Sequence, residues 1–253
     1  MRGLFSLVIL LSSFGFSYAQ KISSDHSDII LTKRIAVKNE KFSTDDSAVY
    51  IIPVVSGKYP ELKKALCDTV LFDGESLDSV TNQYKTEGIG ISYFSYDITY
   101  ATKDIISLQL YYETMGAHPD ESQQWLTLDI HSGKPYPLKQ EINPAGLKWL
   151  FDNYKALIKQ RIFEDKQSTL RDDLTSPEHE DDRNMFNDLE QSIDKLEADE
   201  LFKNYVFSNK GLILMTEGVL PHAVRAHEPD RTWLMSYKKL KPYILPSAIV
   251  LKK

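Results

Sequence analysis

The sequence is poor in cysteine. Its 253 residues include a single one, Cys67, so an internal disulfide is excluded. Stability must therefore come from packing, and an apolar share of 42% is enough for a substantial core. Cys67 lies beside Leu62, Leu66 and Val70 in an expected helix, which predicts a buried packing thiol.

Long hydrophobic runs are missing except at the N-terminus. Arg2 is followed by the apolar stretch Leu4–Phe16 and then by Ser17-Tyr18-Ala19. A basic start, a short apolar stretch and small residues predict a secretory signal peptide, 1–19, cleaved after Ala19. The stretch is shorter than the roughly 20 residues of a membrane span. We therefore expect a periplasmic or secreted protein with no membrane span after signal cleavage.

Positive charge is also scarce. The chain has 30 Lys and Arg against 36 Asp and Glu, a formal net charge of −6. Residues 1–19 carry Arg2 and no acidic residue, so their removal changes the net charge from −6 to −7. This balance argues against nucleic acid and anionic membranes, since both bind basic surfaces. It is compatible with a cationic protein partner.

The motifs of common enzyme classes are absent. The sequence contains no G-x-S-x-G, no H-E-x-x-H, no P-loop and no G-x-G-x-x-G. We therefore expect no catalytic residues and no cofactor.

The hydrophobic pattern predicts strands, then helices, then strands again. Expected strands are 29–37, 49–55, 89–100, 106–112, 125–130, 205–207, 212–215 and 231–237, and expected helices are 60–71, 76–84, 144–162 and 183–197. The three central strands form an antiparallel meander, and 164–182 is a polar connection. The order predicts an α+β fold, in which two main amphipathic helices pack on antiparallel sheet(s).

Two irregularities are expected in the strands. The apolar phase of 89–100 shifts near Tyr93, which indicates a bulge. Pro53 within 49–55 indicates a sheet edge or a bulge. The aromatic residues of the central strands are expected mainly in the core, although an exposed aromatic face could bind glycan or protein.

Histidines are the candidates for metal binding, because imidazole is a common metal ligand. His118 follows one central strand and His131 ends the next, while His222 and His227 lie in a later loop. Four histidines at one end of a sheet could bind a divalent metal, but no pair has H-x-H or H-x-x-x-H spacing. Loop-ordering and surface roles are therefore preferred. The acidic cluster 178–182 is interpreted as a solvated helix start.

Several segments together resemble a known family. They are Tyr50–Gly57 with Pro60-Glu61-Leu62, Ile106-Ser107-Leu108 with Gly116-Ala117-His118-Pro119, Leu128–Lys134, Gly211-Leu212-Ile213, and Ser236–Tyr243. This pattern resembles the extracytoplasmic domain shared by RsiV-type anti-sigma factors and PdaC-type peptidoglycan deacetylases. The family usually has Pro-Tyr followed by Gly where this chain has Pro221–Arg225.

The resemblance implies an α+β domain associated with the cell envelope. In RsiV-type proteins such a domain recognises lysozyme, and in PdaC-type proteins it accompanies a separate deacetylase domain. We expect the envelope domain alone here: a single mature domain, 20–253, with an N-terminal part of about 20–87 and the RsiV/PdaC-like part at about 88–245.

The leading hypothesis is an exported, non-catalytic binding module for a cell-wall glycan, peptidoglycan, or a wall-acting cationic protein such as lysozyme. Its candidate contact loops are 116–120 and 221–229, because loops on a rigid sheet carry recognition. The candidate binding residues are His118, Pro119, His131, His222, Arg225 and His227. A metal-dependent envelope hydrolase that uses the loop histidines is the alternative, and a structural envelope protein is a third possibility.

Overall fold

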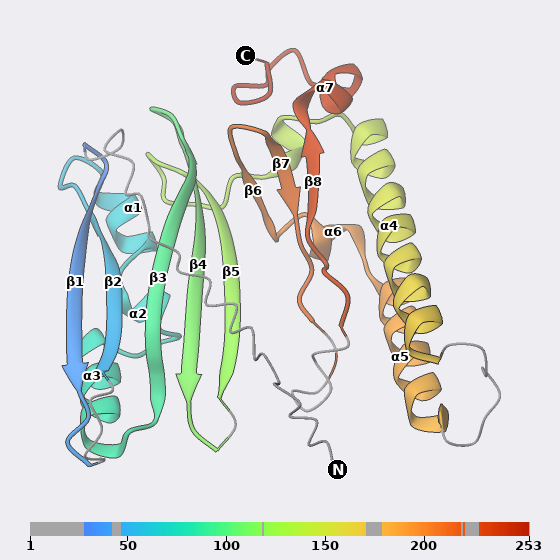
Figure 1. Cartoon of the computed structure of the whole chain (residues 1–253). Coiled ribbons are helices and arrows are strands. Elements are labelled where there is room, and N and C mark those ends of the chain that lie inside the picture. The colour runs from blue at the N-terminus through green and yellow to red at the C-terminus, as the bar shows by residue number, and fades with distance from the viewer. Residues whose placement is uncertain are drawn as a thin grey trace, which may run out of the picture.

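The computed structural model describes residues 28–41, 47–117, 119–170, 179–218, 220 and 228–252. Within them the chain forms two sheets and seven α-helices (Figure 1). The predicted α+β fold is confirmed. None of the described helices combines the length and the apolar character that a membrane span needs.

The larger sheet has five strands in the order β1-β2-β3-β4-β5. The strands are β1 (Ile30–Lys38), β2 (Ser47–Val55), β3 (Gly90–Ala101), β4 (Ile105–Met115) and β5 (Asp120–Asp129). Neighbours are antiparallel except β2 and β3, which pair in parallel at Val49 and Tyr50. The sheet is therefore mixed.

Three short helices cover one face of this sheet. They are α1 (Pro60–Ala65), α2 (Asp68–Leu71) and α3 (Leu77–Glu87). Phe72 links them to the strands, because its ring lies 6.5 Å from that of Tyr50 and 5.1 Å from that of Phe94. Edge-on packing of this kind adds to the stabilisation from burial.

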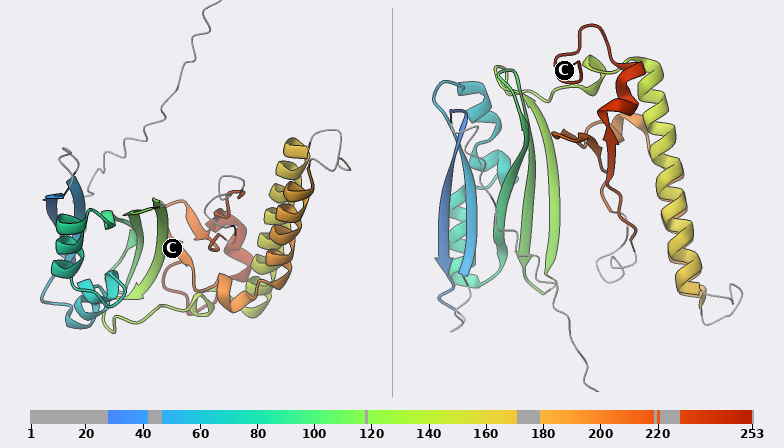
Figure 2. Two further views of the ribbon diagram at one scale, coloured as in Figure 1. Left: turned by 90° about the horizontal axis from the view of Figure 1, so that it is seen from below. Right: turned by 45° about the horizontal axis from the view of Figure 1, so that its top comes forward.

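The smaller sheet and two long helices form a second unit. Its strands are β6 (Tyr205–Phe207), β7 (Gly211–Leu214) and β8 (Trp233–Ser236), and its long helices are α4 (Pro144–Leu170) and α5 (Glu180–Lys195). The short helices α6 (Ala198–Leu201) and α7 (Tyr237–Leu240) contribute to the same core. The three-stranded sheet lies between the five-stranded sheet and the α4–α5 pair (Figures 1 and 2). Both predicted amphipathic helices therefore pack on a sheet.

Each face of β4 belongs to a different core. Ile106 packs with the α1–α3 side, whereas its neighbour Ile105 packs with α4, α5 and the small sheet. Successive strand residues point to opposite faces, so β4 is shared between the two cores. A shift of its register by one residue would exchange the two sets of side chains.

Buried hydroxyl groups join the two sheets. Thr127 of β5 donates to the carbonyl of Tyr205 over 2.9 Å, and Ser107 of β4 accepts from the backbone N–H of Phe207 over 3.2 Å. The two hydroxyl oxygens are 3.0 Å apart. Side chains thus satisfy the edge of β6 where no strand pairs with it among the described elements.

A buried carboxylate anchors the C-terminal segment. Glu141 accepts backbone N–H groups from Ile249, Val250 and Leu251 at 2.8–3.2 Å, and the Tyr136 hydroxyl at 2.7 Å. Its side chain is fully buried, so these bonds replace its hydration. Burial first, and this bond second, raise the pKa of Tyr136.

Several element boundaries differ from the predicted ones. The expected helix 60–71 is interrupted at Leu66–Cys67, where Cys67 is the half-buried N-cap of α2 and not the buried thiol expected. Helix α4 continues eight residues beyond the expected end. Strand β5 begins five residues before the expected start, in the polar segment Asp120–Gln124. The predicted bulge near Tyr93 is present in β3.

Replacing Thr127 by Val should destabilise the fold by about 1–3 kcal/mol, because it leaves the Tyr205 carbonyl without its donor while preserving side-chain shape. Thr114→Val on β4 is the control, because its hydroxyl makes one long bond of 3.4 Å to the Asp120 carbonyl. Denaturant unfolding of both variants measures the difference. An equal effect of the two substitutions would contradict a structural role for the junction.

Candidate functional site: an acidic cleft

Below the junction of the two sheets lies a cleft of about 1750 Å³. One wall is the end of β3–β5 farthest from the junction, the other is formed by the segments that follow β7 and precede β8, and residues of the segment 70–75 on the helix-covered side complete the lining. Nearer the junction, β6 covers the face of the large sheet that forms this wall, and the rings of Tyr100 and Phe207 are 5.9 Å apart there. The cleft therefore begins where the cover of the small sheet ends.

The cleft is strongly acidic. Among the described residues that line it, nine carry carboxylates and one, Arg231, carries a positive charge. The nine are Asp73, Glu75, Asp97, Glu113, Asp120, Glu121, Glu217, Glu228 and Asp230. Carboxylates concentrated around one cleft produce a negative potential that attracts cations.

Two of these carboxylates face each other across neighbouring strands. Glu113 of β4 and Glu121 of β5 are directly opposite in the register. Like charges in this position are destabilising. Partial burial, and secondly the charge of Glu121, raise the pKa of Glu113. The fold therefore keeps an unfavourable charge pair on the floor of the cleft.

The one cation among the described lining residues is already paired. Nε of Arg231 lies 2.8 Å from Oε1 of Glu228, and both side chains are more than nine-tenths buried. The guanidinium also donates to the Ser192 hydroxyl of α5 over 3.3 Å. Because this ion pair is internal to the wall and neutral, eight carboxylates of the described lining remain, of which Asp230 lies 3.6 Å from Nη1 of Arg161 on α4.

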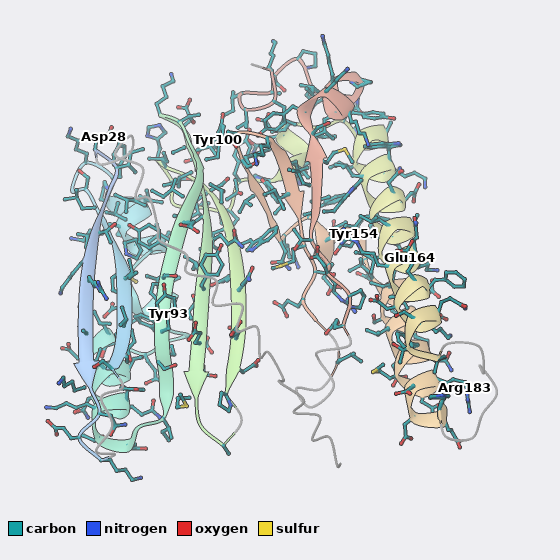
Figure 3. The ribbon with its side chains drawn as sticks, in the orientation of Figure 1. Asp28, Tyr93, Tyr100, Tyr154, Glu164 and Arg183 are labelled. Carbon is teal, nitrogen blue, oxygen red and sulfur yellow. The ribbon has the colours of Figure 1, made fainter. Side chains whose placement is uncertain are left out.

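Helix α4 holds this wall in place. The Tyr154 hydroxyl donates to the Arg231 carbonyl over 2.5 Å and accepts from the backbone N–H of Thr216 over 3.1 Å. Arg161, two turns further along α4, donates to the carbonyls of Asp230 and Thr232. Figure 3 shows Tyr154 on the side of α4 that faces these segments. The segments on both sides of 219–227 are thus attached to the same helix.

Two tyrosines lie between the acidic side chains. Tyr93 of β3 and Tyr111 of β4 line the cleft on the face that carries Glu113, whereas Tyr112 lines it from the helix-covered face, to which Phe94 also points. Burial raises the pKa of Tyr112 to about 12, and its hydroxyl donates to the Leu71 carbonyl over 3.0 Å. An aromatic ring beside carboxylates is suited to a lysine or arginine side chain, which can contact both.

The structure describes only two of the six candidate binding residues that the sequence suggested. His118, His222, Arg225 and His227 lie outside the described residues. Pro119 precedes β5 and His131 follows it, so the ten residues of β5 separate them by roughly 30 Å. His131 lies 3.4 Å from Asp104, at the end of the sheet remote from the cleft.

The described end residues of both loops expected to make contacts nevertheless line the cleft. Asp120 ends the loop 116–120, and Glu228 and Pro229 end the loop 221–229; all three line the same cleft. No group of three or more described His, Cys, Asp or Glu side chains is arranged to hold a metal ion.

The principal acidic residues of the cleft were missed from the sequence. Glu113 and Glu121 lie outside the expected strands 106–112 and 125–130, so each looks like an ordinary surface residue. The signal that could have found them is the count of acids in 113–121, which contains three and no lysine or arginine. Their convergence with Glu217 and Asp230 depends on tertiary structure.

Comparison with known proteins finds similar solved structures. No family model matches the chain, and no curated protein matches it. The structure is similar to the crystal structure of a DUF3298 family protein from Pseudomonas aeruginosa PAO1, with 13% identity and a TM-score of 0.49, covering 86% of this chain and 94% of that one. A DUF3298 member from Bacteroides fragilis NCTC 9343 has 14% identity and a TM-score of 0.45, covering 86% and 93%. These neighbours belong to a domain family of unknown function, and they assign no site.

Glu121→Gln should return the pKa of Glu113 towards its ordinary value, because it removes the facing charge. An acid with a raised folded-state pKa contributes stability that is present at low pH and lost as the pH rises through the folded pKa. The variant should therefore gain stability relative to the native chain above that pKa and little at lower pH. NMR titration of the Glu113 carboxyl and unfolding at two pH values measure both effects. Glu87→Gln, on α3, is the control of equal charge, and an unchanged Glu113 titration would contradict the coupling.

Gly218→Ala should disturb the buried ion pair of the wall. An added Cβ would lie 2.5 Å from Oε2 of Glu228, so the carboxylate must move away from Arg231. Disturbing a buried pair is costly, and we expect a loss of about 1–3 kcal/mol in the free energy of unfolding. Gly57→Ala is the matched control, because no atom lies within 4 Å of its added Cβ. Equal thermal stability of the two variants would refute the proposed close packing.

Proposed function

We propose that this protein is an exported, non-catalytic binding module of the cell envelope, and that its acidic cleft receives a cationic protein such as lysozyme. The observation that carries the proposal is the charge of the cleft: among its described lining residues, Glu228 pairs with Arg231 and Asp230 with Arg161, and seven further carboxylates remain. Export and the envelope location rest on the signal peptide expected at 1–19 and on the resemblance to the RsiV/PdaC-type domain.

The geometry favours a protein over a glycan. A neutral sugar would gain little from so many carboxylates, whereas a basic surface gains long-range attraction and charge-assisted hydrogen bonds. The size of the cleft, about 1750 Å³, also suits several side chains of a partner better than one small molecule. The like-charged pair Glu113 and Glu121 would be relieved by a bound cation, so binding recovers free energy that the empty site loses.

The metal-dependent hydrolase remains the second hypothesis from the sequence. Of its four loop histidines, His131 alone is described, and it lies at the other end of β5 from the cleft. No geometric observation favours this hypothesis over the binding module.

Calorimetric titration of the chain from residue 20 onward with lysozyme tests the proposal. Binding should be saturable and should weaken as salt rises from 50 to 200 mM, roughly the range over which surface charges become screened. A cleft variant with Asp97→Asn, Glu113→Gln and Glu121→Gln should lose about tenfold in affinity at low salt.

The matched control carries Glu87→Gln, Asp152→Asn and Glu164→Gln, which change the net charge equally but lie outside the cleft lining. It should bind lysozyme with an affinity within about threefold of that of the native chain, since its substitutions change the electrostatic potential only away from the cleft. Equal losses in the two variants would show that net charge alone attracts lysozyme. No binding at either salt concentration would refute lysozyme as the partner.

A further inference from the structure

The outer edge of β5 is divided into a covered half and an open half. In the covered half, the carbonyl of Thr127 accepts from the backbone N–H of Tyr136 over 2.8 Å, and the backbone N–H of Asp129 donates to the carbonyl of Lys134 over 2.9 Å. Both groups point away from β4. In the open half, Glu121–Gln124, all side chains are exposed.

The direction of the open backbone groups follows from the register. Strands β4 and β5 pair without a bulge from Asp129 to Asp120. In an antiparallel strand, alternate residues direct both N–H and C=O to the same side. Since Thr127 and Asp129 direct theirs outwards, Trp125, Gln123 and Glu121 do so too.

These outward groups lack strand partners within the described chain. The N–H of Glu121 donates to the side chain of Asp120 over 2.9 Å, whereas no described residue pairs with the backbone N–H of Gln123. Exposed edges are normally protected by proline, lysine or a bulge. The segment Asp120–Gln124 has none of these, and its protection is the negative charge of Asp120 and Glu121.

The negative charge of Asp120 and Glu121 determines which kind of strand can pair with this edge of β5. A second copy of this edge would place Glu121 near acidic residues of the first, which is unfavourable. A basic strand would instead place its lysines or arginines beside Glu121 and Gln123, on the face that also carries Glu113 and Tyr111. On the opposite face, the lining includes the apolar side chain of Val70, which is 54% exposed, together with Asp73 and Glu75.

We propose that an extended segment of the partner, with basic and apolar residues in alternation, adds to the sheet along Glu121–Trp125 of β5. Strand addition supplies main-chain hydrogen bonds for affinity, and alternate side chains supply specificity. The inference rests on the proposed function and deepens it, because it assigns the partner a conformation and a sequence pattern.

The probe is the blocked peptide Lys-Val-Lys-Val-Lys-Val-Lys and two N-methylated forms, one methylated at all lysine nitrogens and one at all valine nitrogens. In an added strand one of these sets points to β5 and the other to solvent. We therefore expect one form to lose at least about tenfold in affinity and the other to stay within about threefold of the unmodified peptide.

Two measurements on the protein complete the test. Hydrogen exchange at the amide of Gln123 should slow at least about tenfold on peptide binding, while that of Thr114 on the interior strand β4 should not change. Gln123→Pro, which removes the outward N–H at an edge position, should weaken binding about tenfold, whereas Gln123→Ala should not.

The outcomes separate this inference from the proposed function. Equal affinity of the two methylated peptides, or an unprotected Gln123 amide, overturns strand addition. The proposed function stands in that case if lysozyme still binds in a salt-sensitive manner. If Gln123→Pro does not fold, the methylated pair and hydrogen exchange decide the matter on the native chain.

Discussion

The structure depends on the contact between the two sheets at Ser107 and Thr127. If β6 paired with the edge strand β5 through backbone hydrogen bonds, it would be a sixth strand of the large sheet. The surface beside it would then simply continue that sheet. Here side-chain hydroxyls take up the polar groups of Tyr205 and Phe207, so β6 crosses the sheet face instead. The two sheets separate beyond this point, and the acidic cleft is the space between them.

The walls of the cleft are held by buried polar groups and not by apolar packing alone. Tyr154 bonds to both the 216 and the 231 segments, and Arg231 is fixed by Glu228. Such networks are costly when incomplete and rigid when satisfied. A rigid wall opposite a strand edge favours a partner that fits without rearranging the protein, which reduces the ordering cost of binding.

Sequence reasoning predicted the architecture well and the site poorly, for one physical reason. The strands of the core and the helices α3, α4 and α5 repeat apolar residues at their own period, so Leu108 or Ile158 indicates its element directly. The first half of β5 has no apolar residue, so nothing in Asp120–Gln124 distinguishes a strand from a loop. Its conformation is imposed by pairing with β4, and the open edge therefore could not be predicted.

The candidate binding residues, mostly histidines, show a second limit of prediction from the sequence. Their residue type attracts attention, yet His131 and Pro119 lie at opposite ends of β5, because the ten residues of that extended strand lie between them. The acids of the cleft come from β3, β4, β5 and the segments around β7 and β8. Only the crossing of the sheets brings these segments together, and no local pattern encodes it.

The burial of Glu141 has a consequence for the order in which the chain acquires its structure. Its three backbone partners are Ile249, Val250 and Leu251, more than a hundred positions further along. A chain that emerges from a ribosome or a translocation pore with its N-terminus first presents this carboxylate to water long before those partners arrive. The core around it must stay open until then, whereas the side formed by β1–β5 and α1–α3 requires no residue beyond β5 and its turn. Vectorial emergence therefore favours completion of the five-stranded half first, with the other half closing on it.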